Sequence, residues 1–410
     1  MIKKIGKFFP LWVVFSFLFC GMIFAAEGDV IWTRTHNGTA NQDDCGYGIA
    51  VDSSGNVYVT GCEEVIGEKH NIWVRKYDSD GNEIWTGTYN GTDDGSDKGH
   101  GIAVDGSGNV YVTGSEAVMG EKRDIWVRKY DTNGNVVWTK THNGTADGWD
   151  VGSGIAVDGN GNVYVTGCEE VTGEGLNIWV RKYDTDGDVI CTRTYNGTNG
   201  GYDGGLGIAV DGSGNIYVTG GESVTGQAFN IWVRKYSSNE REVWTRTYNG
   251  VANNSLDIGH GIAVDGSGNV YVTGSEEGTG KFYNIWVRKY NLEGDEVWTR
   301  THDGTDGKDD AGFDIAVDAR GNVYVTGYET DAWEGHNIWV RKYDSDGNEL
   351  WTRTYSGTAH DDDGYGIAVD GSGNVYVTGS EAVTGESYNI WLRKYEGPFG
   401  EHFEPPIKGK

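Results

Sequence analysis

The segment Gly48–Gly61 reads GIAVDSSGNVYVTG, and close copies of it return six more times along the chain. The isoleucine of the copies stands at Ile49, Ile102, Ile155, Ile208, Ile262, Ile315 and Ile367. Successive isoleucines are separated by 53, 53, 53, 54, 53 and 52 residues. A fixed period of this size indicates one supersecondary unit that is repeated around a ring or along a rod.

Each unit contains four short segments with the composition of β-strands. In the first unit, GIAVD and NVYVTG flank the turn Asp52–Asn56, while IWVRKYD and EIWTGTYNG flank the turn Asp78–Asn82. Aspartate at the first position and glycine at the fourth predict type I turns followed by a glycine bulge. The unit is therefore predicted to be a four-stranded antiparallel sheet.

The register that these turns impose predicts how the sheets pack. The first turn sets Ile49 opposite Val59, and the second sets Arg75 opposite Trp85. Apolar side chains then project from both faces of the sheet, which is typical of a sheet held between two similar sheets. We expect arginine guanidinium groups to stack on aromatic rings within this packing.

The copies of the fourth strand show that the array closes on itself. They are centred on Trp32, Trp85, Trp138, Cys191, Trp244, Trp298 and Trp351. The first of these copies precedes every other strand, whereas the last unit ends after its third strand, near Tyr395. We therefore predict that Val30–His36 completes the seventh sheet, because closure removes the free edge that an open array would expose.

The composition restricts the partners of the protein. Its 410 residues carry a formal net charge of -28. Nucleic acids and anionic membrane surfaces would repel such a chain, so neither is expected as a partner. Cations and neutral polar ligands remain compatible with it.

The N-terminal residues have the pattern of a secretory signal. Lys3, Lys4 and Lys7 precede an uncharged run from Phe8 to Ala26. We predict a signal peptide over 1–26, a propeller domain over 29–395 and a tail over 396–410. A retained membrane anchor is the alternative. The mature domain is expected to be secreted, periplasmic or on the cell surface, without membrane insertion.

The repeated unit resembles a known family. GIAVDGSGNVYVTG at Gly101–Gly114, followed by an IWVRKYD-like strand, resembles the SBBP-type bacterial β-propeller repeat and is similar to NHL-like propeller blades. The resemblance implies an all-β, seven-bladed β-propeller of four-stranded antiparallel blades, with the first strand of each unit innermost. It also implies secreted or surface proteins of mostly unassigned function, and it brings no catalytic motif.

Two sets of carboxylates recur in every unit. The aspartates are Asp44, Asp97, Asp150, Asp203, Asp257, Asp310 and Asp362, and the glutamates are Glu63, Glu116, Glu169, Glu222, Glu276, Glu329 and Glu381. Groups present in every unit favour structural roles, since an active site needs one asymmetric constellation. Calcium binding and glycosidase chemistry are the alternatives. No cofactor is expected apart from the calcium alternative.

Recognition should use the positions at which the units differ. The residue two before each repeated isoleucine is Tyr47, His100, Ser153, Leu206, His260, Phe313 or Tyr365, an uneven and mostly aromatic series. Loop residues Trp149 and Trp333 have no counterpart in the other units, and Tyr328 replaces a small residue or cysteine. We predict ligand-binding roles for Tyr47, His100, His260, Phe313, Tyr328, Trp333, Tyr365 and Trp149, concentrated around the sixth unit. Packing at the channel mouth is the alternative for these residues.

These patterns predict a monomeric propeller that binds a glycan or a peptide on its loop face and has no enzymatic activity. A lyase or glycosidase and a purely structural surface protein are the alternatives. No metal site is expected, because His100 and His260 belong to units three positions apart. Whether Cys45 and Cys62 form a disulfide is left open by their spacing.

Overall fold

The computed structural model describes residues 26–398, apart from 93–94, 119–121, 199, 251–254, 281, 305–306, 332–334 and 359–360. Residues 1–25 of the predicted signal peptide and 399–410 of the predicted tail lie outside these residues. Over the described ranges, the chain forms 28 strands in seven four-stranded sheets. None of the described residues belongs to a helix that is long and apolar enough to cross a membrane.

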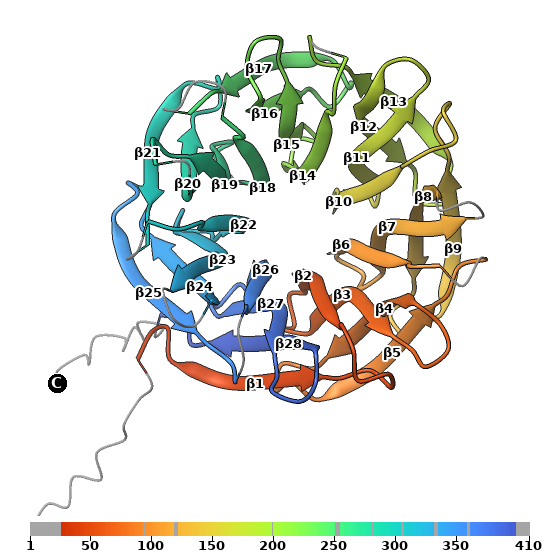
Figure 1. Cartoon of the computed structure of the whole chain (residues 1–410), viewed down its shortest axis with the longest axis vertical. Helices are drawn as coiled ribbons and strands as arrows, with labels where there is room; N and C mark the ends of the chain where they lie inside the picture. The colour runs from red at the N-terminus through yellow and green to blue at the C-terminus, as the bar shows by residue number, and fades with distance from the viewer. Residues whose placement is uncertain are drawn as a thin grey trace, which may run out of the picture.

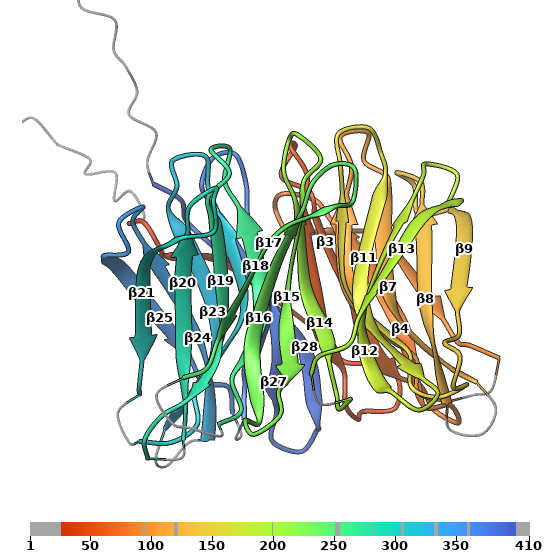
Figure 2. The ribbon, with the colours of Figure 1, turned by 90° about the horizontal axis from the view of Figure 1, so that it is seen from above.

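The seven sheets are blades arranged around a central axis, and their strands run roughly along it (Figures 1 and 2). The innermost strands are β2 (Cys45–Val51), β6 (Lys98–Val104), β10 (Val151–Val157), β14 (Gly204–Val210), β18 (Ile258–Val264), β22 (Ala311–Val317) and β26 (Asp363–Val369). The second strands are β3 (Val57–Glu64), β7 (Val110–Val118), β11 (Val163–Val171), β15 (Ile216–Ser223), β19 (Val270–Glu277), β23 (Val323–Asp331) and β27 (Val375–Ala382).

The third and fourth strands form the outer half of each blade. The third strands are β4 (His70–Tyr77), β8 (Lys122–Tyr130), β12 (Gly175–Tyr183), β16 (Phe229–Tyr236), β20 (Tyr283–Tyr290), β24 (Gly335–Tyr343) and β28 (Tyr388–Tyr395). The outermost strands are β5 (Glu83–Tyr89), β9 (Val136–His142), β13 (Val189–Tyr195), β17 (Glu242–Tyr248), β21 (Glu296–His302), β25 (Glu349–Tyr355) and β1 (Val30–His36). We number the blades one to seven in the order of their innermost strands.

The N-terminal strand closes the ring. β1 pairs with β28 and is the outermost strand of the sheet that contains β26, β27 and β28 (Figure 1). Its side chains also reach the next blade: Trp32 Nε1 donates to the carbonyl of Ser79 at 3.2 Å, and Arg34 Nε donates to that of Gly81 at 2.7 Å. The predicted closure is confirmed, and it joins the seventh blade to the first.

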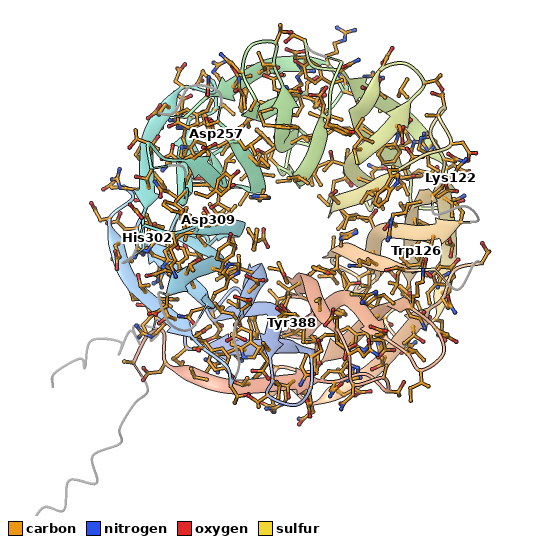
Figure 3. All side chains as sticks on the ribbon, viewed as in Figure 1. Lys122, Trp126, Asp257, His302, Asp309 and Tyr388 are labelled. Atoms are coloured by element: carbon orange, nitrogen blue, oxygen red, sulfur yellow. The ribbon has the colours of Figure 1, made fainter. Side chains whose placement is uncertain are left out.

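Seven apolar clusters fill the spaces between neighbouring blades (Figure 3). Between blades one and two, Tyr58 and Ile72 of the first blade pack against Val112 and Trp126 of the second. The third strand of every blade contributes one fully buried tryptophan. Both faces of each sheet are therefore buried, as the sequence pattern predicts.

The predicted register is correct in the inner hairpin and wrong in the outer one. Ile49 faces Val59, as expected. Arg75, however, faces Thr86, because a bulge beside Tyr77 shifts the pairing between β4 and β5. The stacking of the guanidinium group therefore involves its own strand: the Arg75 Cζ atom lies 4.8 Å from the ring centroid of Trp73.

Candidate functional site

The recurring aspartates hold the loops that precede the innermost strands. The buried carboxylate of Asp97 accepts hydrogen bonds from the backbone N–H groups of Gly91 and Ala117, and burial raises its pKa. The same arrangement recurs in all seven blades. Each of these carboxylates holds two loop segments together, since it accepts hydrogen bonds from two backbone N–H groups.

The recurring glutamates are also occupied by partners within the fold. Glu116 accepts a hydrogen bond from the Tyr89 hydroxyl at 2.7 Å, and Glu169 pairs with His142 at 2.8 Å. A tyrosine or histidine at the end of an outermost strand contacts the glutamate in each of the other blades. In the part of the chain that is described, no three His, Cys, Asp or Glu side chains form a group that could hold a metal ion.

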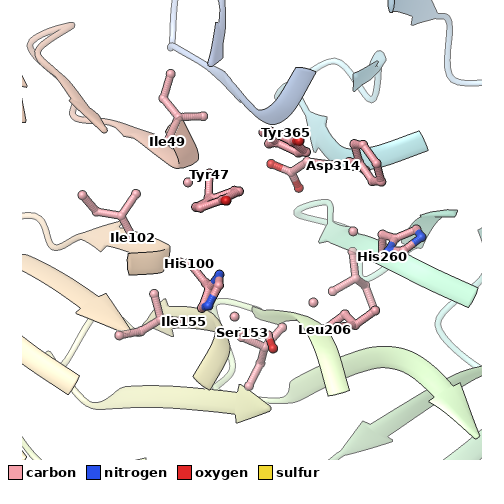
Figure 4. A pocket seen from close by; sticks show the side chains of 18 residues that line it. Tyr47, Ile49, His100, Ile102, Ser153, Ile155, Leu206, His260, Asp314 and Tyr365 are labelled. Atoms are coloured by element: carbon pink, nitrogen blue, oxygen red, sulfur yellow. The ribbon is translucent and has the colours of Figure 1, made fainter. Parts of the chain in front are cut away.

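A bulge in each innermost strand points one side chain toward the axis. In β2 the pairing passes from Gly46–Gly61 to Gly48–Thr60 and leaves Tyr47 between them. The corresponding bulges occur in the other six blades. Bulges re-aim side chains, and the seven re-aimed residues are the uneven series identified in the sequence. They line an axial cavity of about 250 Å³, together with glycines and isoleucines of the same strands (Figure 4).

Five of the seven re-aimed residues carry aromatic rings, and these rings form a continuous series along the cavity wall. The ring centroid of Tyr365 lies 5.2 Å from that of Tyr47 and 5.3 Å from that of Phe313. His100 extends the series beyond Tyr47 at 5.5 Å, and His260 extends it beyond Phe313 at 5.4 Å. We call these five residues the aromatic arc. Burial lowers the pKa of both histidines to about 4, so they are neutral near pH 7.

Asp314 is the one acidic residue that lines this cavity. The other six blades have glycine here, which lets neighbouring innermost strands approach: a Cβ on Gly48 would lie 2.7 Å from the carbonyl oxygen of His100. The Asp314 carboxylate instead accepts the backbone N–H of Ile367 at 2.9 Å and that of Ile315 at 2.8 Å. Burial nevertheless raises its pKa to about 7.

A polar chain connects the cavity to the loop face between blades six and seven. The Tyr365 hydroxyl donates to Asp363 Oδ2 at 3.0 Å, and Asp363 Oδ1 lies 3.1 Å from His336 Nδ1. The ring of Tyr328 stacks on His336 with centroids 3.9 Å apart. The sequence analysis did not identify His336 or Asp363. Comparing their positions across the seven units would have found them, because no other unit combines His and Asp there.

A second cavity lies on the loop face between blades three and four. It has a volume of about 560 Å³ and is lined by Trp149, Glu170, Leu176, Tyr202 and three glycines. Trp149 is 54% exposed and Tyr202 is 67% exposed. The Trp149 backbone N–H donates to Glu170 Oε2 at 3.0 Å, which fixes the carboxylate beside the aromatic rings. We call this site the Trp149–Tyr202 cleft.

The expectation that Trp149 has no counterpart needs correction. The residue before each recurring aspartate is Asp43, Ser96, Trp149, Tyr202, Leu256, Asp309 or Asp361. Tyr202 therefore occupies the Trp149 position of the next unit, and Leu256 continues the series. Three consecutive blades present apolar side chains at this position, whereas the other four present polar ones.

Of the eight predicted ligand-binding residues, five form the aromatic arc. Tyr328 lies beside the arc, with its ring 5.6 Å from that of Phe313. Trp149 lies apart from it, in the cleft between blades three and four. Trp333 lies outside the described residues. The binding roles of all eight stay predictions.

Cys45 and Cys62 lie opposite each other in the first blade. The bulge at Tyr47 brings them into register, which alternation of side chains along the strand did not predict. Both are free thiols in the structure.

A ring of seven four-stranded antiparallel blades around an axial cavity defines a seven-bladed β-propeller. The family model of the SBBP β-propeller repeat matches five segments of the chain, residues 31–61, 87–115, 144–167, 243–275 and 350–380. The resemblance noted in the sequence is therefore confirmed. No curated protein matches the chain by sequence.

Solved structures share the fold at low sequence identity. The polysaccharide lyase Uly1 is 11% identical with a TM-score of 0.53, and the similarity covers 86% of this chain and 90% of that one. A PL25 ulvan lyase is 10% identical with a TM-score of 0.53, over 91% and 94% of the two chains. A protein of unknown function from Dyadobacter fermentans is 11% identical with a TM-score of 0.49, over 90% and 98%.

The prediction that the protein has no enzymatic activity needs correction, because this architecture does not support it. Propellers of the same fold include polysaccharide lyases, so the fold does not exclude catalysis. The expectation rested on the absence of an asymmetric constellation. The chain formed by Tyr365, Asp363 and His336 is such a constellation, and among the described residues it occurs in one sector of the ring.

Proposed function

We propose that the protein binds a neutral polysaccharide on its loop face, in the Trp149–Tyr202 cleft. The observation that carries this proposal is the pair of exposed aromatic rings beside a fixed carboxylate. Aromatic faces stack on the apolar faces of sugar rings, while Glu170 can accept hydrogen bonds from sugar hydroxyls. Exposed aromatic clusters of this kind on a soluble domain mark binding surfaces.

The charge of the protein favours a neutral glycan over an anionic one. The formal net charge is -28, and Glu170 lines the cleft; the Arg123 guanidinium, which is not among the lining residues, lies 5.4 Å from the ring centroid of Trp149. An anionic polysaccharide would meet repulsion both at long range and inside the cleft. Neutral glycans avoid this repulsion and still supply hydroxyl donors.

The proposal includes export of the protein. The N-terminal segment has three lysines followed by an uncharged run, as in secretory signals. An exported propeller meets polysaccharides of cell envelopes and of the surroundings. Detection of the mature protein outside the cytoplasm, with its N-terminus near residue 27, would support this part.

The test compares two variants in which an apolar residue becomes the serine found in another blade. Trp149→Ser introduces the serine that the second unit has at this position, Ser96. Leu292→Ser introduces the serine that the first unit has at the equivalent position, Ser79, in the turn between the third and fourth strands. On a glycan array and in titrations of the best glycan, Trp149→Ser should weaken binding by about 1–3 kcal/mol. The Leu292→Ser control should bind like the wild type.

Equal binding by wild type and Trp149→Ser would refute the cleft as the binding site. A peptide library probed in parallel distinguishes a peptide ligand from a glycan. The chain length of the bound polysaccharide, followed over time with the wild type, shows whether binding is accompanied by cleavage.

A further inference from the structure

The axial cavity contains one carboxylate beside a series of aromatic rings. Among the residues that line it, Asp314 alone is acidic, and its carboxylate is held by backbone N–H groups of β22 and β26. Two hydrogen bonds leave lone pairs of both oxygens unused. Figure 4 shows Asp314 with Tyr47 and Tyr365 around the opening of the cavity.

The rings of the aromatic arc present π-electron density, which attracts cations within about 6 Å of a ring centroid. The protein itself uses this attraction at the edge of the arc. The Lys98 ammonium lies 5.8 Å from the ring centroid of Tyr47 and 3.5 Å from its hydroxyl oxygen. The arc continues past Tyr47 through Tyr365 and Phe313 toward His260.

The electrostatic surroundings favour a cation over an anion. His100 and His260 are neutral near pH 7, so they do not offset the carboxylate. The positive groups near the arc are the Lys98 ammonium, which contacts Tyr47, and the Arg123 guanidinium, which acts on His100. Neither is among the groups that donate hydrogen bonds to the Asp314 carboxylate in the described part of the chain. The formal net charge of -28 raises the local concentration of cations around the whole molecule.

We propose that the axial cavity binds a small organic cation of the quaternary ammonium class, with its charge between Asp314 and the rings of Tyr365, Phe313 and Tyr47. Methyl groups of such a cation pack against aromatic faces, and its charge is balanced by the carboxylate. A neutral molecule of the same shape gains the packing without the charge interaction. The site is separate from the Trp149–Tyr202 cleft and does not depend on glycan binding.

The experiment titrates the whole protein at about pH 8 with choline and with its neutral carbon isostere, dimethylbutanol, using calorimetry and ligand-observed NMR. The Asp314→Gly variant carries the residue of the other six blades, and Phe313→Leu carries the residue of the fourth. Both substitutions are therefore compatible with the fold of a blade. Leu292→Ser, an exposed position that does not line the cavity, is the control.

Choline should bind the wild type at least tenfold more tightly than dimethylbutanol does. Asp314→Gly should remove this preference, Phe313→Leu should weaken choline binding, and Leu292→Ser should leave it unchanged. Equal binding of choline and its isostere, no binding of choline, or unchanged choline binding by Asp314→Gly would each overturn the proposal. Glycan binding by Asp314→Gly should equal that of the wild type, which separates this site from the cleft.

Discussion

Asp314→Gly should change how the stability of the propeller depends on pH. Burial raises the pKa of Asp314 from 3.8 to about 7, so the folded protein keeps a proton that the unfolded chain has released. Stability is therefore lost as the pH rises from about 4 to about 7 and is constant above that. A difference of about 3 pKa units corresponds to about 4 kcal/mol, of which about 2.5 kcal/mol falls between pH 5 and pH 8.

The assay is urea unfolding of both proteins at several pH values between about 5 and 8. Other carboxylates titrate in this window, since burial also raises the pKa of Asp362 to about 6. The readout is therefore the difference between wild type and variant at each pH, which cancels these shared contributions. The variant should gain about 2.5 kcal/mol relative to the wild type as the pH rises across the window. Parallel curves for the two proteins would refute the assignment of a buried, proton-holding carboxylate.

Three further predictions concern the scaffold. Deleting 29–36 should leave the seventh blade with three strands and an open edge, so the protein should melt at lower temperature and aggregate; a deletion that melts and elutes like the full chain would contradict the closure. Asp97→Ala leaves two backbone N–H groups without an acceptor and should lower the free energy of unfolding by about 2–4 kcal/mol. The same change at exposed Asp80 should have little effect. Similar values for both variants would exclude a role of Asp97 in holding the loops together. If calcium bridges the loop carboxylates, excess chelator should lower the melting temperature by several degrees, and an unchanged melt would remove calcium from the account.

The repeat pattern was sufficient to predict the architecture. Short-range chemistry dictates it: the aspartate and glycine of each turn set the hairpins, and Gly55 adopts the positive φ of 80° that such a turn needs. The phase of the repeats predicted that Val30–His36 joins the last sheet. The outer register was wrong by one residue at Arg75, because the bulge beside Tyr77 depends on the geometry of the turn rather than on side-chain type.

The candidate sites were predictable only in part. The aromatic series around the axis was visible as variation among equivalent positions, although the bulge at Tyr47 that re-aims these residues was not. The Trp149–Tyr202 cleft was missed, because its residues come from two units and only the packing of blades brings Tyr202 next to Trp149. His336 and Asp363 come from consecutive units in the same way.

The pairing of β1 with β28 also determines the order in which the molecule can be completed. The Thr33 hydroxyl accepts a hydrogen bond from Arg393 across 360 positions of the sequence. β1 precedes the other described strands of the ring, whereas its partner β28 is the last of them, so six blades can form before the ring closes. Long-range pairing of this kind slows folding. Until β28 is available, the backbone groups of β1 that later pair with it have no partner in the seventh blade, so this strand is exposed to pairing with other edges.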